Sequence, residues 1–212
     1  MSRILQTARQ TTDLRQSALV KAALRLAAQR CPTDITTADL AQAVGISQGA
    51  VFRHFSSKQA VWLAVLDWVS EHLMHDLHAA VQSRHSSSEG FNPLAALQDV
   101  FVAHVDFVVS HPGVPRVVFQ ELQHAEETPL KAAVRALMEQ YRALVIELLL
   151  NAKSQKLLAP DTNVPSAAVL FLGSVQGLVM QLLVSGQVQA MAAQAPGVFA
   201  IYLRGITLRD TP

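Results

Sequence analysis

Apolar residues recur at steps of three and four positions along almost the whole of this 212-residue chain. That spacing is typical of helices that bury one face. No segment sustains an alternation of apolar and polar residues, and no Asn-Gly or Asp-Gly pair is present to close a β-hairpin. Half of the residues are hydrophobic, which is enough to build a sizeable core. The sequence therefore predicts an all-α fold.

Residues that start and stop helices divide the chain into about nine predicted helices. Thr36 and Ser47 suit the N-cap position, and Pro165 and Pro196 suit the first turn. Residues 86–90, which contain three consecutive serines, form the clearest linker. The predicted helices cover residues 12–30, 36–44, 47–55, 59–84, 93–110, 115–124, 129–155, 165–185 and 196–209.

Charge is distributed unevenly along the chain. Residues 1–60 hold eight Lys or Arg against three acidic residues, a net charge of +5, whereas the remainder carries −4. This asymmetry favours an anionic partner at the N-terminal end. Arg3, Arg9 and Arg15 could form an arm that enters a minor groove, or could belong to a frayed terminus. The single cysteine, Cys31, excludes an internal disulfide.

The segment from Thr36 to Lys58, TTADLAQAVGISQGAVFRHFSSK, predicts two short helices joined by a tight turn at Gly45. Its apolar positions, which should pack the helices together, are Leu40, Ala41, Val44, Ile46, Val51 and Phe55. The positions expected to stay exposed on the second helix are Gln48, Gly49, Ala50, Arg53 and His54. Small residues and polar side chains on one face are typical of a recognition helix that approaches DNA closely.

This segment resembles the DNA-binding domain of the TetR family of transcriptional regulators. The family pattern V-S-x-G-x-x-Y-x-H-F-x-x-K is matched here by ISQGAVFRHFSSK, residues 46–58. One departure is Phe52, which stands where the family usually carries a tyrosine whose hydroxyl contacts a phosphate. The resemblance implies a homodimer built on the last two of nine helices. It also implies a DNA-binding helix-turn-helix domain at residues 1–58 and a helical regulatory domain at 59–212.

Roles at individual positions follow from the same resemblance. It implies that Gln48, Ala50 and Arg53 read bases of a double-stranded operator. A glutamine amide can bind adenine through two hydrogen bonds, and an alanine methyl can touch a thymine methyl. The resemblance further implies that the phosphate contacts come from Thr37, His54 and Lys58.

Five aromatic or polar residues lie on otherwise apolar stretches of the regulatory domain: His104, Phe107, Phe119, Tyr141 and Gln176. Apolar walls with a few convergent polar groups describe a small-molecule pocket, although at any single position ordinary core is the better explanation. The resemblance implies a pocket between the helices predicted at 93–110, 129–155 and 165–185. The expected function is a repressor that a small, largely apolar effector releases from a palindromic operator.

The stretch from Val169 to Val184 is apolar nearly all round, which the surface of a monomer would not tolerate. Gly173 and Gly177 lie one helical turn apart and would allow close approach of a second helix. We therefore expect a homodimer interface that includes Val169, Gly173, Gly177 and Met180. Because the apolar stretches are interrupted at residues such as Gln176, we expect no membrane span and a cytoplasmic location.

The sequence allows three other interpretations. The protein could bind DNA without a ligand and dock a protein partner on its regulatory domain. The sequence Gly45–Gly49 fits G-x-S-x-G, so Ser47 could be a hydrolase nucleophile, but that motif needs a preceding strand where a helix is predicted. His72, His75 and His78 follow at three-residue steps and could bind a metal, but a polar helix face explains them better. No enzymatic activity, metal or cofactor is expected.

Overall fold

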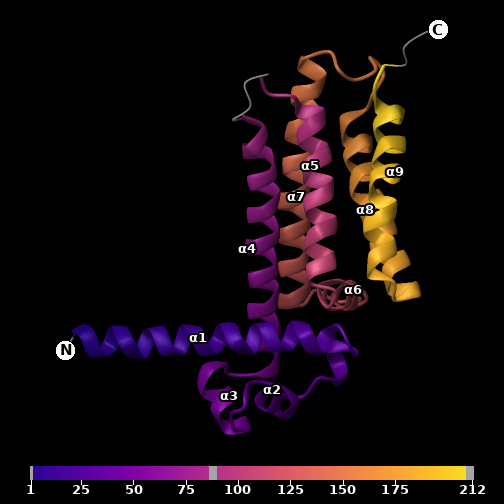
Figure 1. Ribbon diagram of the computed structural model, residues 1–212. Coiled ribbons are helices and arrows are strands. Elements are labelled where there is room, and N and C mark those ends of the chain that lie inside the picture. The colour runs from indigo at the N-terminus through magenta and orange to yellow at the C-terminus, as the bar shows by residue number, and fades with distance from the viewer. Residues whose placement is uncertain (1, 86–89, 209–212) are drawn as a thin grey trace. The chain divides into compact units, whose positions relative to one another are not determined.

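The structure, a computed structural model, describes residues 2–85 and 90–208, with side chains from residue 14 onward (Figure 1). Within these ranges the chain forms nine α-helices and one short 3₁₀-helix, and the only extended pairing is an isolated bridge between Leu158 and Thr207. The all-α prediction is confirmed. The elements are α1 (Ser2–Ala27), η1 (Pro32–Asp34), α2 (Thr37–Val44), α3 (Gln48–His54), α4 (Lys58–His85), α5 (Pro93–Ser110), α6 (Val114–Leu122), α7 (Pro129–Ser154), α8 (Val164–Ser185) and α9 (Val188–Ile206).

The ends of two helices differ from the prediction. Helix α1 begins at Ser2, about ten residues earlier than expected, because no glycine or proline interrupts the chain before Pro32. Helix α9 begins at Val188 and carries Pro196 in its interior, where the sequence predicted a helix start. Packing of the buried face of α9 offsets the backbone hydrogen bond that a proline cannot donate. The predicted end near residue 209, most of the 86–90 linker, and the side chains of Arg3 and Arg9 lie outside what the structure describes.

The chain forms two compact units. Unit 1 consists of Met1–Ser70 and His111–Arg135, and unit 2 consists of Glu71–Ser110 and Ala136–Pro212. Helices α4 and α7 each contribute residues to both units. The sequence gives no local sign of these boundaries, because they fall inside two continuous helices and between α5 and α6.

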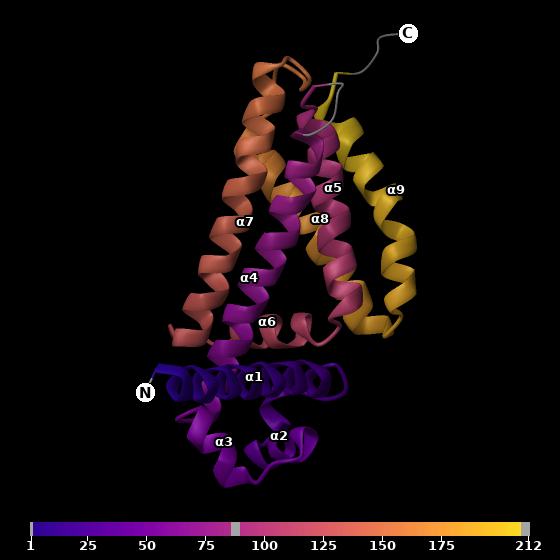
Figure 2. The same cartoon turned by 60° about the vertical axis from the view of Figure 1, so that its left-hand side comes forward.

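In unit 1, α2 and α3 lie on one side of α1 and α6 lies on the other (Figure 2). The buried face of α1 includes Leu19, Ala22, Ala23 and Ala27. Small residues on this face let neighbouring helices approach closely. One close approach is at Gly113, at the start of α6, where a Cβ atom would stand 2.1 Å from the backbone oxygen of Leu24.

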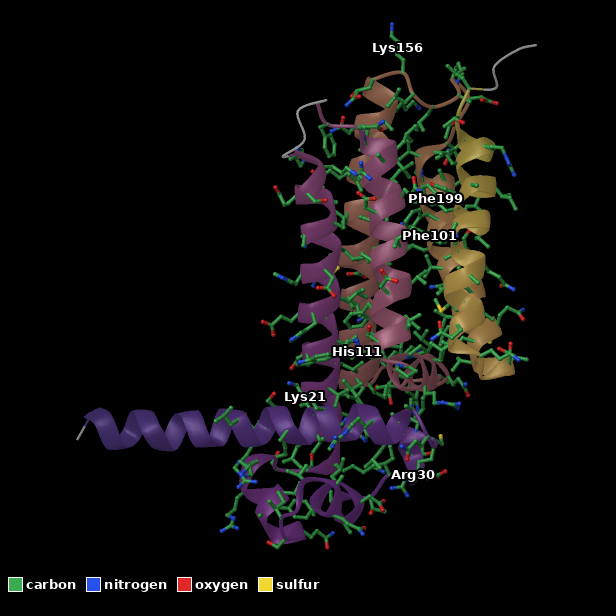
Figure 3. All side chains as sticks on the ribbon, in the orientation of Figure 1. Lys21, Arg30, Phe101, His111, Lys156 and Phe199 are labelled. Carbon is green, nitrogen blue, oxygen red and sulfur yellow. The ribbon has the colours of Figure 1, made fainter. Side chains whose placement is uncertain are left out.

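In unit 2, α8 and α9 pack against each other and α9 packs against α5 (Figure 1). Its core includes a cluster of five aromatic side chains in ring contact: Phe101, Tyr141, Phe171, Phe199 and Tyr202. Figure 3 shows Phe101 and Phe199 between α5 and α9, and their ring centroids are 5.4 Å apart. The hydroxyl of Tyr202 donates a hydrogen bond of 3.2 Å to the carbonyl of Ala167.

Two helices, α5 and α8, are long and apolar enough to cross a membrane by length and composition alone. Both contribute buried residues to unit 2, including Phe101 from α5 and Phe171 from α8. Core helices of globular folds commonly meet the same criterion, so this is weak evidence for a span. The absence of a membrane span stays a prediction.

Candidate DNA-binding and effector sites

Helix α2 begins at a fully formed capping box. The hydroxyl of Thr36 accepts a hydrogen bond of 3.1 Å from the Asp39 backbone amide, and the Asp39 carboxylate accepts one of 2.7 Å from the Thr36 amide. The backbone amide of Thr36, then its hydroxyl, and then Arg30 at 3.0 Å lower the pKa of Asp39 to about 2. The carboxylate therefore stays ionised, and the start of α2 is held in place near neutral pH.

The turn between α2 and α3 has the geometry that the sequence predicts. Gly45 ends α2 in the left-handed region, at φ 72°, which a residue with a Cβ atom rarely adopts. Ser47 is the N-cap of α3, and its hydroxyl accepts a hydrogen bond of 3.2 Å from the Ala50 amide. Since helix α2 precedes Ser47, the strand required by a hydrolase nucleophile turn is not there.

The exposed surface of α3 differs from the prediction at two positions. Gln48, Gly49 and Arg53 are exposed as expected, but Ala50 is only 9% exposed and His54 is half-buried, so the expected exposure of these two residues was wrong. The cause is the packing of α3, in which Ala50 joins the buried side next to Val51. Phe52 is instead 49% exposed, which leaves a large apolar ring on the surface where the family pattern has tyrosine.

Gln48 and Thr37 are joined before any DNA is present. The side-chain amide nitrogen of Gln48 donates a hydrogen bond of 2.8 Å to the Thr37 hydroxyl. Thr37 is the first residue of α2, and Gln48 is the first residue of α3. The bond limits the conformations of the long glutamine side chain and so reduces the entropy lost when it binds a partner. The sequence did not predict this contact, because eleven residues and a turn separate the two positions.

The Lys58 side chain and the His54 backbone, at the other two predicted phosphate contacts, are hydrogen-bonded within unit 1. The Lys58 ammonium group donates a hydrogen bond of 2.8 Å to the carbonyl of Thr33, which uses one of its three donors. The His54 carbonyl accepts a hydrogen bond from the Gln16 side chain at 3.0 Å. The Nδ1 atom of His54 is buried and has no hydrogen-bond partner among the described residues. A contact of His54 with DNA would therefore have to use its other ring nitrogen.

Lys58 also lines an open cleft of about 340 Å³ within unit 1. The lining of the cleft includes Glu121, which is 5% exposed and is the only buried Asp, Glu, Lys or Arg side chain in the described part of the chain. The imidazole of His124 lies 3.7 Å from the Glu121 carboxylate, and the Gln120 amide donates a hydrogen bond of 3.4 Å to it. The buried carboxylate in this cleft therefore has polar neighbours within α6 and the turn after it.

His104 and Tyr141, two of the predicted effector residues, lie together in the interior of unit 2. Their ring centroids are 5.2 Å apart. The Tyr141 hydroxyl and the His104 Nδ1 atom are both buried, and neither has a hydrogen-bond partner in the part of the protein that the structure describes. Burial lowers the pKa of His104 to about 4 and raises the pKa of Tyr141, so both groups are neutral near pH 7.

The other three predicted effector residues, Phe107, Phe119 and Gln176, lie in environments that differ from that of the pair. Phe107 is buried one turn further along α5, and Phe119 is half-buried on α6 in unit 1. Gln176 is exposed on α8, so its placement among inward-facing residues was wrong. Its position follows from helical geometry, because the buried residues Phe171, Val175 and Leu178 occupy the opposite face. The cluster of aromatic rings that includes Tyr141 was missed because four different helices, α5, α7, α8 and α9, supply its members.

The outer face of α8 and α9 is apolar and carries several exposed side chains. They are Val169, Leu170, Met180, Val184 and Ile201. A Cβ atom added at Gly173 or Gly177 would meet no atom within 4 Å, so both glycines open onto free space in the single chain. Arg204 is the only Asp, Glu, Lys or Arg between residues 164 and 208. Such a surface is typical of a subunit interface.

His72, His75 and His78 are all exposed on α4. Within residues 2–85 and 90–208, no group of three metal-ligating side chains is close enough to hold an ion. The structure therefore adds no support to the metal interpretation of this histidine series.

Comparison with known proteins agrees with the geometry of the helix-turn-helix. The family description "Bacterial regulatory proteins, tetR family" matches residues 19–65, and "Tetracyclin repressor-like, C-terminal domain" matches residues 90–196, about half of the chain. The nucleoid occlusion factor SlmA of Marinomonas sp. (strain MWYL1) is 23% identical over 145 residues, which are 68% of this chain and 71% of that protein.

Two solved structures share the fold over almost the entire chain. The ketosteroid transcriptional regulator KstR2 of Mycobacterium tuberculosis has a TM-score of 0.74 and 23% identity, covering 92% of this chain and 96% of its own. FadR of Bacillus subtilis, solved in complex with stearoyl-CoA, has a TM-score of 0.74 and 14% identity, covering 90% and 98%. This chain therefore belongs to the TetR family and is a DNA-binding transcriptional regulator.

Proposed function

We propose that the protein is a homodimeric repressor that a small, largely apolar effector releases from a palindromic operator. Residues 1–58 bind DNA, and residues 59–212 bind the effector and dimerise, in the cytoplasm. The observation that carries the effector role is the buried pair of polar atoms on His104 and Tyr141, which have no partner among the described side chains. Buried polar groups are nearly always hydrogen-bonded, so this pair is suited to a ligand.

Repression and release form one equilibrium in this proposal. The dimer interconverts between an arrangement that fits two successive major grooves and one that does not. An effector that binds the second arrangement more tightly lowers the population that can hold the operator. The likeness to FadR with stearoyl-CoA supports an effector, since a protein of the same fold holds a small molecule.

On DNA, Gln48 and Arg53 are the proposed base-reading residues, and Thr37, His54 and Lys58 are the proposed phosphate contacts. Gln48 stands at the N-terminal end of α3, the end that enters the major groove in helix-turn-helix docking. Ala50 is not proposed as a base reader, because its methyl group is largely buried.

Gln48→Ala and Lys58→Ala should have different effects on DNA binding. Gln48→Ala is expected to cost roughly 1–3 kcal/mol on the operator and much less on scrambled DNA, because the amide discriminates between base pairs. Lys58→Ala should weaken binding to both DNAs about equally and lower the salt slope by about one unit, because about one fewer counterion is released. Salt titrations of both variants against both DNAs measure these effects.

The hydrogen bond between Gln48 and Thr37 adds a second result to that experiment. Thr37→Val removes the hydroxyl that accepts from Gln48, so the single substitutions should not add in the double variant. Ser56→Ala, at an exposed position after α3, is the control and should leave operator binding unchanged. Equal losses on operator and scrambled DNA for Gln48→Ala would show that Gln48 does not read bases. If Gln48→Ala, Lys58→Ala and Thr37→Val all left DNA binding unchanged, the DNA-binding assignment of α3 would be contradicted.

The proposed dimer uses the outer face of α8 and α9. Gly177→Leu should weaken dimerisation strongly, because a leucine would stand where a partner helix needs close approach. Ala79→Leu, at an exposed position on α4, places the same side chain away from this face and should leave the dimer intact. Light scattering over a dilution series measures both. A Gly177→Leu dimer as tight as the wild type would exclude this face from the interface.

A second candidate function is supported by the likeness to SlmA. That relative is named a nucleoid occlusion factor, which suggests that a protein of this family can act through a partner while on DNA. In this alternative the regulatory domain binds a protein and no effector is needed. Heat-stability measurements with a metabolite collection separate the two candidates, because a ligand that binds only the native state raises its stability.

A further inference from the structure

We propose that the effector is an electrically neutral, largely apolar molecule whose hydroxyl or carbonyl oxygen bonds Tyr141 and His104. This inference rests on the proposed function, in which unit 2 binds an effector, and it names the chemical class of that effector. It excludes organic acids, acyl-CoA thioesters and amines, which are ionised near pH 7.

The first argument comes from the unpaired atoms. Tyr141 is fully buried, and its hydroxyl has neither a donor nor an acceptor beside it in the described structure. The Nδ1 atom of His104 is in the same condition, with the two rings 5.2 Å apart. A buried polar group left unpaired is costly, so a ligand that pairs both gains affinity. One hydroxyl oxygen can accept from the Tyr141 hydroxyl and donate its own proton to His104.

The second argument comes from the charges of unit 2. None of its described Asp, Glu, Lys or Arg side chains is buried. The two that are only partly exposed, Arg84 in the last turn of α4 and Asp99 in the first half of α5, already form an ion pair with each other. An ionised ligand group in this interior would therefore have no counter-charge, and burying an unpaired charge costs far more than burying a hydroxyl.

The protonation state of His104 supports the same conclusion. An imidazolium ion could have held a carboxylate, but burial lowers the pKa of His104 to about 4. The ring is therefore neutral at pH 7 and offers one donor and one acceptor without charge. Tyr141 also stays protonated, because burial raises the pKa of its hydroxyl. Both groups suit an alcohol, a phenol or a ketone.

The rings next to the pair are apolar. The Tyr141 ring packs in a T-shaped arrangement with Phe171 at a centroid distance of 6.3 Å, and Phe171 in turn contacts Phe101 at 5.5 Å. Tyr202 lies outside the proposed site, against Phe171 at 5.5 Å, and its hydroxyl is already bonded to Ala167. In the described part of unit 2, the buried polar side-chain atoms left for a ligand are those of Tyr141 and His104.

The test uses the full-length protein and matched probe compounds. Naphthalene, adamantane and octane each serve as the apolar body, with a hydroxyl, a carboxylate, an aminomethyl group or no polar group attached. Heat stability is measured for the wild type and for Tyr141→Phe, His104→Phe and Tyr202→Phe. We expect at least one alcohol to stabilise the wild type, whereas the carboxylate and ammonium forms of that body do not.

Loss of one hydrogen bond should weaken binding of that alcohol about five- to tenfold in Tyr141→Phe and in His104→Phe. Tyr202→Phe is the matched control from the same aromatic core and should leave the affinity unchanged, because its hydroxyl is bonded within the protein. Since two variants test the pair independently, failure of one to fold leaves the other decisive.

Three outcomes would overturn the proposal. The first is equal stabilisation by the carboxylate or ammonium form of a body. The second is alcohol binding that neither Tyr141→Phe nor His104→Phe weakens. The third is no stabilisation by any alcohol, as expected if the pair holds only a buried water.

Measuring operator binding in the presence of each bound compound distinguishes failure of the neutral-effector proposal from failure of the proposed repressor function. An acid that binds and releases the operator would contradict neutrality but not effector control. A neutral ligand that binds through Tyr141 without changing operator affinity would contradict effector control but not the chemical class.

Discussion

Gly113→Ala is expected to lower the free energy of unfolding by roughly 3 kcal/mol or more, which is the upper part of the range for steric overlap in a tightly packed interior. The added Cβ atom would stand 2.1 Å from the Leu24 backbone oxygen and 2.8 Å from the Ala28 backbone nitrogen. These two atoms are joined by a helical hydrogen bond of 3.1 Å, so neither can move aside without breaking it. Helix α1 also packs against α2 and α3, and operator binding should therefore fall as well.

Gly49→Ala is the matched control for this substitution. Gly49 lies within α3, and an added Cβ atom there would meet nothing within 4 Å. Alanine is also the better helix former by about 1 kcal/mol, so the stability of Gly49→Ala should equal or exceed that of the wild type. Urea unfolding followed by circular dichroism compares the variants. A Gly113→Ala protein with an unchanged unfolding midpoint would show that α1 and the start of α6 have room to separate.

The wild-type protein should lose stability as the pH falls from about 6.5 towards 4, by up to about 3 kcal/mol from His104 alone. The folded-state pKa of His104 is lowered from 6.5 to about 4 by burial. Within this window the unfolded chain binds a proton at this position and the folded chain does not. Acid therefore favours unfolding, and the effect is absent above the unfolded-state pKa, where neither state is protonated.

His104→Phe should remove most of this pH dependence. The substitution keeps an aromatic ring of similar size and removes the titrating group. His75→Phe provides the comparison, because His75 is exposed on α4 and its replacement should leave the wild-type loss of stability in place. Unfolding free energies from urea titrations at pH 7.5 and 4.5 give the difference for each protein. An equal loss of unfolding free energy between pH 7.5 and 4.5 in the wild type and in His104→Phe would show that His104 is not buried in its neutral form in solution.

The sequence alone determined the helix-turn-helix, because local chemistry specifies each of its parts. Thr36 and Ser47 cap their helices through hydrogen bonds to amides three residues ahead. Gly45 supplies the left-handed turn between them. The apolar spacing also identified the all-α fold. These features depend on interactions within a few residues, and helical periodicity reports them directly.

The tertiary structure decided the features that depend on contacts between distant segments. The same periodicity that identifies α8 as a helix cannot say that Gln176 faces outward, because α8 is apolar on nearly every side and only its neighbours choose the buried face. Pro196 resembles a helix start until the packing of α9 against α5 and α8 shows a continuous helix. The pairing of His104 with Tyr141 joins residues 37 positions apart. The need for glycine at Gly113 arises only because the backbone of α1 lies against it, a distance that no local pattern encodes.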